Sequence, residues 1–452
     1  MITLENGKTK LNRSTIATSR LMDFCSEKEL TAQTGHTSAD WPLVILKELM
    51  DNALDACEEG SVAPEIDMQV NHAGITITDN GPGIPPTTIE RVLDFSVRVS
   101  SREAYVAPDR GAQGNALKTI VMMPFVLDGK VGQVEIVARG IRHIVNVAVD
   151  SIRQQPVVDH RQEESLEPVK KGTAVSVRWP DSACSILTDA KGRFLQIAED
   201  YTFLNPHLTL NLNWMGVETP VGAIDRDWAK WRPDEPTCVH WYRLEDLTRL
   251  LGAYVADDQD NGRDRTVREF IAEFRGLSGT AKQKKVLEAT ALQRVNLSAL
   301  VDGHGIRRDR VESLLLAMRQ NTKPVKPNDL GIIGKDNLAT KFESIGCEMK
   351  SFDYRKVIKE TDEGLPFVLE TAFGWCESLP QRRMVLGVNW SPGILNPFRQ
   401  LGSLGLSLDS VLEQQRVGRN EPVVFLLHCA CPRVEYTDRG KSAVVVRGGR
   451  PQ

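Results

Sequence analysis

The chain has 452 residues, of which 41% are apolar and 26% charged, and its formal net charge is -4. This composition is ordinary for a globular protein, and at roughly 100–200 residues per domain the length allows several domains. Because acidic side chains slightly outnumber basic ones, a uniformly basic coat for nucleic acid is excluded, although a local basic patch is not. The polar first residues and the short apolar runs predict neither a signal peptide nor a membrane span, so we expect a cytoplasmic protein.

The first part of the chain is predicted to be an α+β domain. Apolar positions at helical spacing indicate a helix over 40–59, with Asp40 as its N-cap and Gly60 at its end. Alternating apolar residues predict strands over 66–70, 74–78, 133–139, 144–149, 173–179 and 208–214.

The pattern then changes to short helices and afterwards returns to strands. Helices are expected at 244–251, 267–275, 282–291, 297–301 and 308–319, and a polar stretch with two prolines over 321–329 is a candidate linker. Strands are expected at 366–373, 383–388 and 423–430, with a helix over 407–415. We therefore predict three domains, over 1–220, 221–325 and 326–452.

Polar residues line one face of the predicted helix 40–59. Glu48, Asn52 and Asp55 follow one another at intervals of four and three residues, which places them on the same side. A carboxylate and a carboxamide one turn apart suit the polarisation of a water and the binding of a hard cation. A solvated polar face would give the same pattern.

A second candidate site follows the strand 74–78 directly, where the chain reads Asp-Asn-Gly-Pro-Gly-Ile over 79–84. Gly81 and Gly83 allow the backbone to approach a planar ligand closely, and Asp79 can accept a hydrogen bond from an amino group. Taken alone, this segment also fits a plain turn.

Two further motifs come later in the chain. A loop from Arg110 to Lys118 contains Gly111 and Gly114 and leads into an apolar run, and its backbone amides could hold phosphates. The spacing of a Walker A motif is absent, and a surface loop is the alternative. The dipeptide 172–173, Gly-Thr, opens the strand 173–179.

In this order the four motifs resemble the N, first-glycine, second-glycine and Gly-Thr boxes of the GHKL ATPase fold. That fold is shared by gyrase-type topoisomerases, Hsp-type chaperones, histidine kinases and MutL. The resemblance implies an ATP-binding α/β sandwich with ATP and Mg²⁺ as cofactors, Glu48 as the general base and Asn52 as the Mg²⁺ ligand. It places Asp79 at the adenine amino group with Thr173 supporting that contact, and the loop 110–118 over the phosphates. The nucleotide contacts it implies are Asn52, Asp55, Asp79, Gly81, Gly83, Ile84, Gly111, Gln113, Gly114, Asn115, Ala116, Leu117, Lys118 and Thr173.

Segments along the chain are also similar to the B subunit of topoisomerase VI, the type IIB enzyme. They are DACEEGSVAP at 55–64, DNGPGIPP at 79–86, Asn-Pro-His at 205–207, VREFIAEF at 267–274, KPNDLGIIG at 326–334 and the stretch 422–446. The resemblance implies a helix-two-turns-helix insert, a transducer domain, and Lys441 as the lysine that reaches the γ-phosphate. It further implies an ATP-dependent homodimer that gates duplex DNA, with cleavage supplied by a separate A-type or nuclease-like subunit.

The sequence departs from that family in ways that leave alternatives open. Ala116 stands where the family usually has a glycine, and Lys118 could serve the phosphates or face solvent. Since few residues follow Lys441, we do not expect the helical stalk that joins the B subunit to its A subunit. A stand-alone GHKL switch acting on a protein client, or a subunit that binds but barely hydrolyses ATP, are the alternatives.

Basic residues of the helical region are the candidates for DNA contact. They are Lys282, Lys284, Lys285, Arg307, Arg308, Arg310, Lys323 and Lys326. Such side chains can bind phosphates in a salt-dependent manner without reading bases. Because Asp309 and Glu312 are interleaved with them, a solvated helix face is the alternative.

Overall fold

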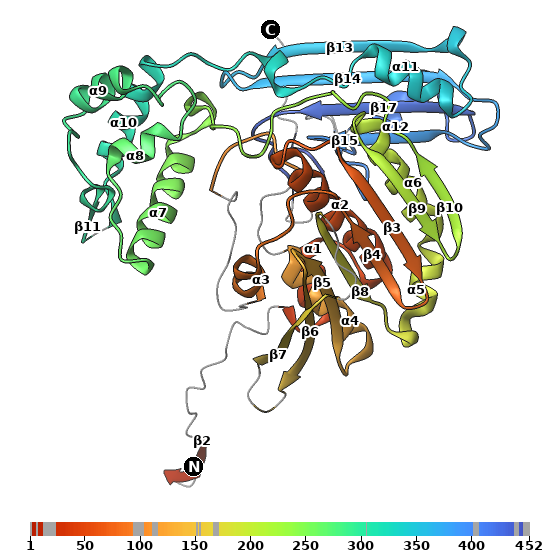
Figure 1. Cartoon of the computed structure of the whole chain (residues 1–452), viewed down its shortest axis with the longest axis horizontal. Coiled ribbons are helices and arrows are strands. Elements are labelled where there is room, and N and C mark those ends of the chain that lie inside the picture. The colour runs from red at the N-terminus through yellow and green to blue at the C-terminus, as the bar shows by residue number, and fades with distance from the viewer. Residues whose placement is uncertain are drawn as a thin grey trace.

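The computed structural model describes residues 24–93, 104–110, 116–150, 152, 155–165, 171–303, 305–400, 406–437 and 443–445, and the backbone of strands β1 (Ile2–Glu5) and β2 (Lys8–Leu11). Figure 1 shows a large sheet covered by helices, a helical unit beside it, and a second sheet across the top. Within these ranges no helix is both long and apolar enough to cross a membrane.

The large sheet has eight strands in the order β10-β9-β3-β4-β8-β5-β6-β7. They are β3 (Glu65–Asn71), β4 (Gly74–Thr78), β5 (Gly132–Ala138), β6 (Ile141–Asp150), β7 (Gln155–Glu164), β8 (Thr173–Arg178), β9 (Thr209–Trp214) and β10 (Val217–Val221). In β3 exposed and buried residues alternate, because only one face of the strand meets the core. Strands β4 and β8 pair antiparallel, so the end of β4 lies beside the start of β8.

Helices cover this sheet, and they are α1 (Glu27–Thr34), α2 (Trp41–Glu59), α3 (Pro86–Leu93), α4 (Ala116–Asp128), α5 (Cys184–Asp189) and α6 (Lys191–Leu204). The predicted helix 40–59 is confirmed as α2, which packs Leu46, Met50 and Leu54 into the core. Asp40 occupies the N-cap position of α2, as predicted. Asp40 makes no side-chain capping bond to α2, and its carboxylate pairs instead with Arg193 at 2.6 Å.

The helical unit, which we call the helical insert, consists of α7 (Leu244–Asp260), α8 (Val267–Ala272), α9 (Thr280–Ala289) and α10 (Arg308–Gln320). A capping box starts α8, because Thr266 Oγ1 accepts from the Glu269 amide at 3.2 Å while the Glu269 carboxylate accepts from the Thr266 amide at 2.7 Å. The helix predicted over 297–301 is instead a short 3-10 helix (Leu297–Leu300), followed by strands β11 (Val301–Asp302) and β12 (Gly305–Ile306).

The second sheet has five strands in the order β13-β14-β17-β15-β16. They are β13 (Asp353–Glu360), β14 (Pro366–Trp375), β15 (Arg383–Val388), β16 (Ser391–Pro392) and β17 (Val423–Ala430), with α11 (Lys335–Ser344) and α12 (Leu408–Gln414) as helices. One hydrophobic core runs through the helical insert and one face of this sheet, and a separate core fills the eight-stranded sheet. Strand β10 crosses the predicted boundary at 220, and the three domain limits stay a prediction.

Candidate functional site

The end of strand β4 holds a buried carboxylate. Asp79 Oδ1 accepts hydrogen bonds from the amides of Gly81 at 2.8 Å and Thr173 at 3.3 Å. Burial raises the pKa of Asp79 to about 6, although these two amides act in the opposite direction. The Asp79 carboxylate is therefore held in place by neutral donors, and it can still accept a hydrogen bond from a ligand.

Glycines let the loop 79–84 fit tightly against the start of β8. Gly172 has φ +96°, and a Cβ there would lie 1.8 Å from the Asp79 carbonyl oxygen, so a side chain would push the loop away. The Ile84 amide donates to Thr173 Oγ1 at 3.1 Å, and the Asp79 amide donates to the Thr173 carbonyl at 2.9 Å. Thr173 thus supports the Asp79 loop, and Gly172, which the sequence-based site omitted, makes the close approach geometrically feasible.

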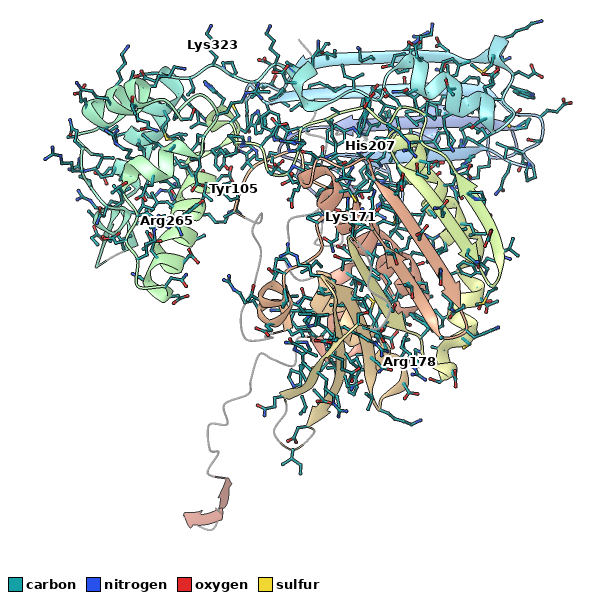
Figure 2. The ribbon with its side chains drawn as sticks, viewed as in Figure 1. Tyr105, Lys171, Arg178, His207, Arg265 and Lys323 are labelled. Carbon is teal, nitrogen blue, oxygen red and sulfur yellow. The ribbon has the colours of Figure 1, made fainter. Side chains whose placement is uncertain are left out.

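A cavity of about 360 Å³ borders this loop, lined by Gly60, Val62, Asn80, Gly81, Pro82, Arg139, Lys171 and Gly172. Arg139 Nε donates to the Gly83 carbonyl at 3.0 Å, and Gly83 itself has φ +78°. Arg139 and Lys171 (Figure 2 labels the latter) place positive charge beside the candidate adenine site. The sequence analysis did not identify Arg139 or Lys171 as part of the site. The only local signal for Arg139 was the Arg-Gly turn between β5 and β6.

Helix α2 carries the predicted general base and the predicted Mg²⁺ ligand. Glu48 is half-buried and Asn52, one turn later, is exposed. The third member of the predicted face differs, because the Asp55 carboxylate is buried and accepts from Arg110 Nη1 at 2.6 Å. We therefore assign Asp55 to an internal ion pair, whereas Glu48 and Asn52 remain the candidates for chemistry.

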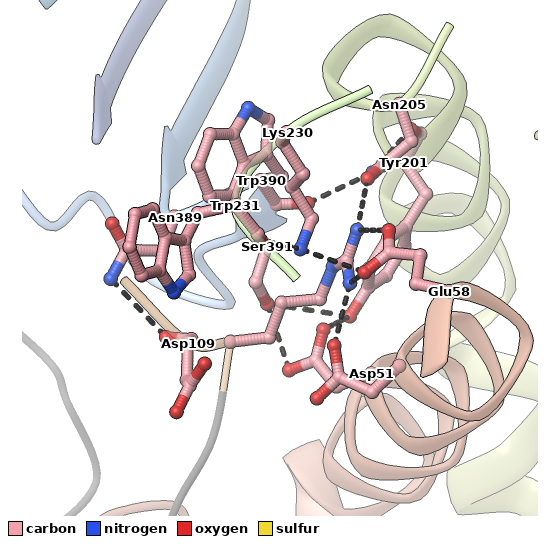
Figure 3. Close-up of polar contacts among 12 residues, drawn as sticks. Asp51, Glu58, Asp109, Tyr201, Asn205, Lys230, Trp231, Asn389, Trp390 and Ser391 are labelled. Atoms are coloured by element: carbon pink, nitrogen blue, oxygen red, sulfur yellow. Dashed lines mark hydrogen bonds and ion pairs between the residues drawn. The ribbon is translucent and has the colours of Figure 1, made fainter. Parts of the chain in front are cut away.

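Beneath α2 lies a buried group that we call the Arg110 cluster, made of Asp55, Glu58, Arg110, Asn205, His207 and Lys230 (Figure 3 labels Glu58, Asn205 and Lys230). The two terminal nitrogens of Arg110 lie 2.7 Å and 2.6 Å from the Glu58 oxygens. Lys230 Nζ lies 2.7 Å from Glu58 Oε2, and Arg110 Nη2 donates to Asn205 Oδ1 at 2.5 Å. Two carboxylates thus face two cations, which is the condition for burying charge.

Burial and the charges of the Arg110 cluster shift the pKa values of Glu58 and His207. Burial alone would raise the pKa of Glu58, but Arg110 and Lys230 hold it well below its usual value. Burial lowers the pKa of His207, which lies 3.1 Å from Glu58 Oε1. Glu58 is therefore a structural anion rather than a candidate acid or base.

A turn of the second sheet reaches helix α2 and the Arg110 cluster, as Figure 3 shows. Ser391 Oγ donates to Asp51 Oδ2 at 2.9 Å, and Tyr201 donates to the other oxygen of Asp51 at 2.7 Å. The Trp390 carbonyl accepts from Asn205 Nδ2 at 2.9 Å, and Asn389 Nδ2 donates to the Asp109 carbonyl at 3.2 Å. The turn 389–391 therefore contacts α2, α6 and the segment that carries Arg110.

Several predicted site residues lie outside the described residues. They are Gly111, Gln113, Gly114, Asn115 and Lys441, and Ala116 is described only as the first residue of α4. Leu117 is half-buried in α4 and Lys118 is almost fully buried. The alternative in which Lys118 faces solvent is therefore wrong. Its ammonium group lies inside the domain, next to the glycine-containing loop.

The residues present fit a magnesium–nucleotide complex. Mg²⁺ takes hard oxygen ligands, and with a nucleotide it needs only one or two of them from protein. The Asn52 carboxamide and the Glu48 carboxylate, one turn apart on α2, supply such oxygens. Among the described residues no group of three or more His, Cys, Asp or Glu side chains forms a metal site, so a metal bound by protein alone is not indicated there.

The chain is similar to several known proteins. Residues 38–183 match the family described as histidine kinase-, DNA gyrase B-, and HSP90-like ATPase. The chain is 25% identical over 426 residues to the B subunit of type 2 DNA topoisomerase 6 from Archaeoglobus fulgidus, which covers 89% of this chain and 66% of that protein. It is 23% identical over 439 residues to the corresponding protein of Methanosarcina barkeri, and this match covers 91% of this chain and 66% of that protein. The solved B subunit of DNA gyrase from Myxococcus xanthus is 10% identical with a TM-score of 0.40, covering 94% of this chain and 88% of that one.

The chain thus spans about two thirds of the length of the curated relatives it matches. The matched ATPase region contains helix α2, the loop 79–84 and the start of strand β8, which together form the candidate site. Residues 38–183 form a GHKL-type ATPase domain with an α+β fold, and the chain is related over most of its length to the B subunits of DNA topoisomerase VI.

Proposed function

We propose that this chain is the ATP-binding and ATP-hydrolysing subunit of a topoisomerase VI B-like complex, in which ATP-driven dimerisation gates the passage of duplex DNA. The observation that carries the proposal is the Asp79 site, where a buried carboxylate with neutral partners lies beside Thr173 at one end of helix α2. The extent of similarity to the B subunits of topoisomerase 6 supports it.

In the proposed reaction Asp79 accepts a hydrogen bond from the adenine amino group, and Gly81, Gly83, Ile84 and Thr173 shape the surroundings of the base. Glu48 orients the attacking water and accepts its proton, while the Asn52 oxygen binds the metal. Mg²⁺, when bound, neutralises charge on the phosphates, and phosphoryl transfer otherwise depends mainly on positioning. Lys118 and the sequence-predicted Lys441 would add positive charge at the phosphates.

We further propose that the helical insert contacts duplex DNA without reading its sequence. The supporting residues in α9 are Lys282, Lys284 and Lys285, all exposed. Arg308 is exposed as well, although it pairs with Glu245 at 2.7 Å, and Lys323 projects outward in Figure 2. Binding to phosphates through such side chains weakens steeply as salt rises.

The proposal is tested by steady-state ATPase assays with and without long duplex DNA, with Glu48→Ala as the catalytic control. We expect ATP turnover that DNA stimulates at low salt, with the stimulation fading as salt rises. Glu48→Ala should keep nucleotide binding and trap the dimer, which light scattering detects. Lys441→Ala should lower turnover at nearly unchanged nucleotide affinity.

The alternative is a stand-alone ATPase switch with a protein client and no topoisomerase activity. It would give robust turnover that long DNA leaves unchanged at every salt concentration. If that result is obtained, the DNA-gating role and the search for an A-type or nuclease-like partner are both abandoned. Absence of ATP binding would overturn the assignment of the site itself.

A further inference from the structure

One short segment bridges the helical insert and the ATPase domain. The described residues Ala104–Arg110 lie between helices α3 and α4, and Figure 2 shows Tyr105 next to the insert. The segment has no helix or strand of its own. Its position is therefore set by its contacts with the elements around it.

The first end of the segment is bound to the helical insert. Tyr105 Oη donates to Glu273 Oε2 at 2.7 Å and also contacts Tyr254 Oη. The rings of Tyr105 and Tyr254 are nearly perpendicular, with centroids 6.4 Å apart, and the Arg265 guanidinium lies 4.4 Å above the Tyr254 ring. Tyr254 belongs to α7, and Glu273 directly follows α8. One phenol thus joins two helices of the insert.

The next residue strengthens this attachment. Val106 is buried, and its amide donates to Tyr242 Oη at 3.0 Å. Its carbonyl accepts from Thr237 Oγ1 at 2.7 Å. Both backbone groups of Val106 are therefore satisfied by side chains that immediately precede the insert helices.

The second end of the segment is bound to helix α2. Arg110 makes its ion pairs with Asp55 and Glu58, both on α2, within the Arg110 cluster. The Asp109 carbonyl accepts from Asn389 of the second sheet. The same helix carries Glu48 and Asn52. A displacement of α7 and α8 can therefore reach the candidate catalytic helix through fewer than ten residues of chain.

We propose that Tyr105 is a positioning residue through which the helical insert acts on helix α2, so that what binds the insert changes ATP turnover. The effect on turnover rests on the proposed function, whereas the mechanical link does not. Tyr105 touches neither α2 nor the Asp79 loop in the contacts described, so its influence there must pass along the segment to Arg110.

The experiment compares Tyr105→Phe with Tyr354→Phe in the full chain. Both variants lose a phenol hydroxyl that donates to a carboxylate, since Tyr354 Oη donates to Glu370 at 2.8 Å in the second sheet. Hydrogen exchange of the nucleotide-free protein is measured first. We expect Tyr105→Phe to speed exchange of amides in α2, whereas Tyr354→Phe leaves them unchanged. Equal exchange of α2 in both variants and the parent chain overturns the link.

ATPase assays then separate coupling from folding. Tyr105→Phe should keep its DNA affinity and its basal turnover but lose about fivefold or more of the DNA stimulation, the low end of coupling between two sites. A full DNA response in Tyr105→Phe, or a parallel loss of DNA affinity, overturns the positioning role. If the parent chain shows no DNA response, the proposed function fails, and the exchange experiment still decides the link.

Discussion

Glu58 and Asp79 are both buried carboxylates of the ATPase domain, and their pKa values move in opposite directions. Glu58 faces Arg110 and Lys230, and these cations hold its pKa well below the usual range in spite of burial. Burial raises the pKa of Asp79 to about 6, because its contacts are two neutral amides. The region beneath α2 has therefore paired its charges internally, whereas the candidate site at Asp79 has kept polar groups that a ligand can use.

The same division separates two groups of polar residues on helix α2. Asp51, Asp55 and Glu58 are buried and bound to partners, while Glu48 is half-buried and Asn52 exposed. A polar side chain that binds another part of the protein contributes to stability, and one that stays accessible can contribute to chemistry. Substitutions in the two groups should thus affect different measurements.

The largest effect is expected at Glu48. Replacing it with Gln removes the proposed base, and general-base contributions are about 10² to 10⁴ in rate. ATPase assays should show that loss in kcat, while equilibrium binding of ATP stays near the parent value. Glu59→Gln, an exposed residue of the same helix, is the control and should keep full turnover. Hydrolysis that persists in Glu48→Gln would remove the base assignment.

Arg110→Met is expected to have the next largest effect, this time on stability. It leaves Asp55 and Glu58 buried without one of their cations, a change that costs about 3–5 kcal/mol. Urea unfolding measures the loss in the free energy of unfolding. Arg142→Met removes an exposed ion pair with Glu135, and its cost should be about 1 kcal/mol or less. Equal costs for the two substitutions would contradict the structural role of the Arg110 cluster.

The Asp79 site and the Arg110 cluster also show what local sequence can and cannot predict. The period of apolar residues in α2 and the Asp-Asn-Gly-Pro-Gly-Ile turn are local signals, so the helix and the position of Asp79 were predictable. The Arg110 cluster was not, because Arg110 lies 52 residues from Glu58 and only the fold brings them together. For the same reason, the ion pair that holds Asp55 to Arg110 was not predictable from the residues of α2.

Missed elements have equally physical reasons. Strand β7 is mostly polar and exposed at the edge of its sheet, so it shows no apolar alternation. Helix α4 is apolar on nearly all sides and contains Pro124, which hides its helical period. In both cases the surroundings in the fold determined the structure.

At Asp79 we expect an effect of intermediate size, on the pH dependence of ATP affinity. The ionised carboxylate is the better acceptor for an adenine amino group, so ATP affinity should rise by about tenfold between pH 5 and pH 7, given a pKa of about 6. Asp79→Asn keeps an acceptor oxygen without titrating, and the difference between the two pH profiles isolates this group from the titration of ATP. Identical profiles would contradict the contact.

Stability of the nucleotide-free protein should respond to pH with the opposite sign. The folded Asp79 carboxyl binds its proton more tightly than the unfolded one, so its contribution is present at low pH and is lost as the pH rises from about 4 to about 6. Glu58, with a lowered pKa, contributes at neutral pH and loses its contribution as acid protonates it. Urea unfolding of Asp79→Asn and of the parent chain, measured across this pH range, separates the contribution of Asp79 from that of Glu58.

A further effect on stability is expected at Ser391, where the second sheet meets helix α2. Ser391→Ala removes the hydrogen bond to Asp51 and the contact with Lys47, and such a bond to a charged group is worth about 1.5–3 kcal/mol. Ser313→Ala, an exposed residue whose hydroxyl binds a carbonyl of its own helix, should stay within about 0.5 kcal/mol. A loss of stability in Ser391→Ala with an unchanged KM for ATP places this turn with the internal pairs. A change in KM would instead mean that the internal pairs are coupled to the candidate catalytic residues of α2, since Asp51 and Asn52 are neighbours on one helix.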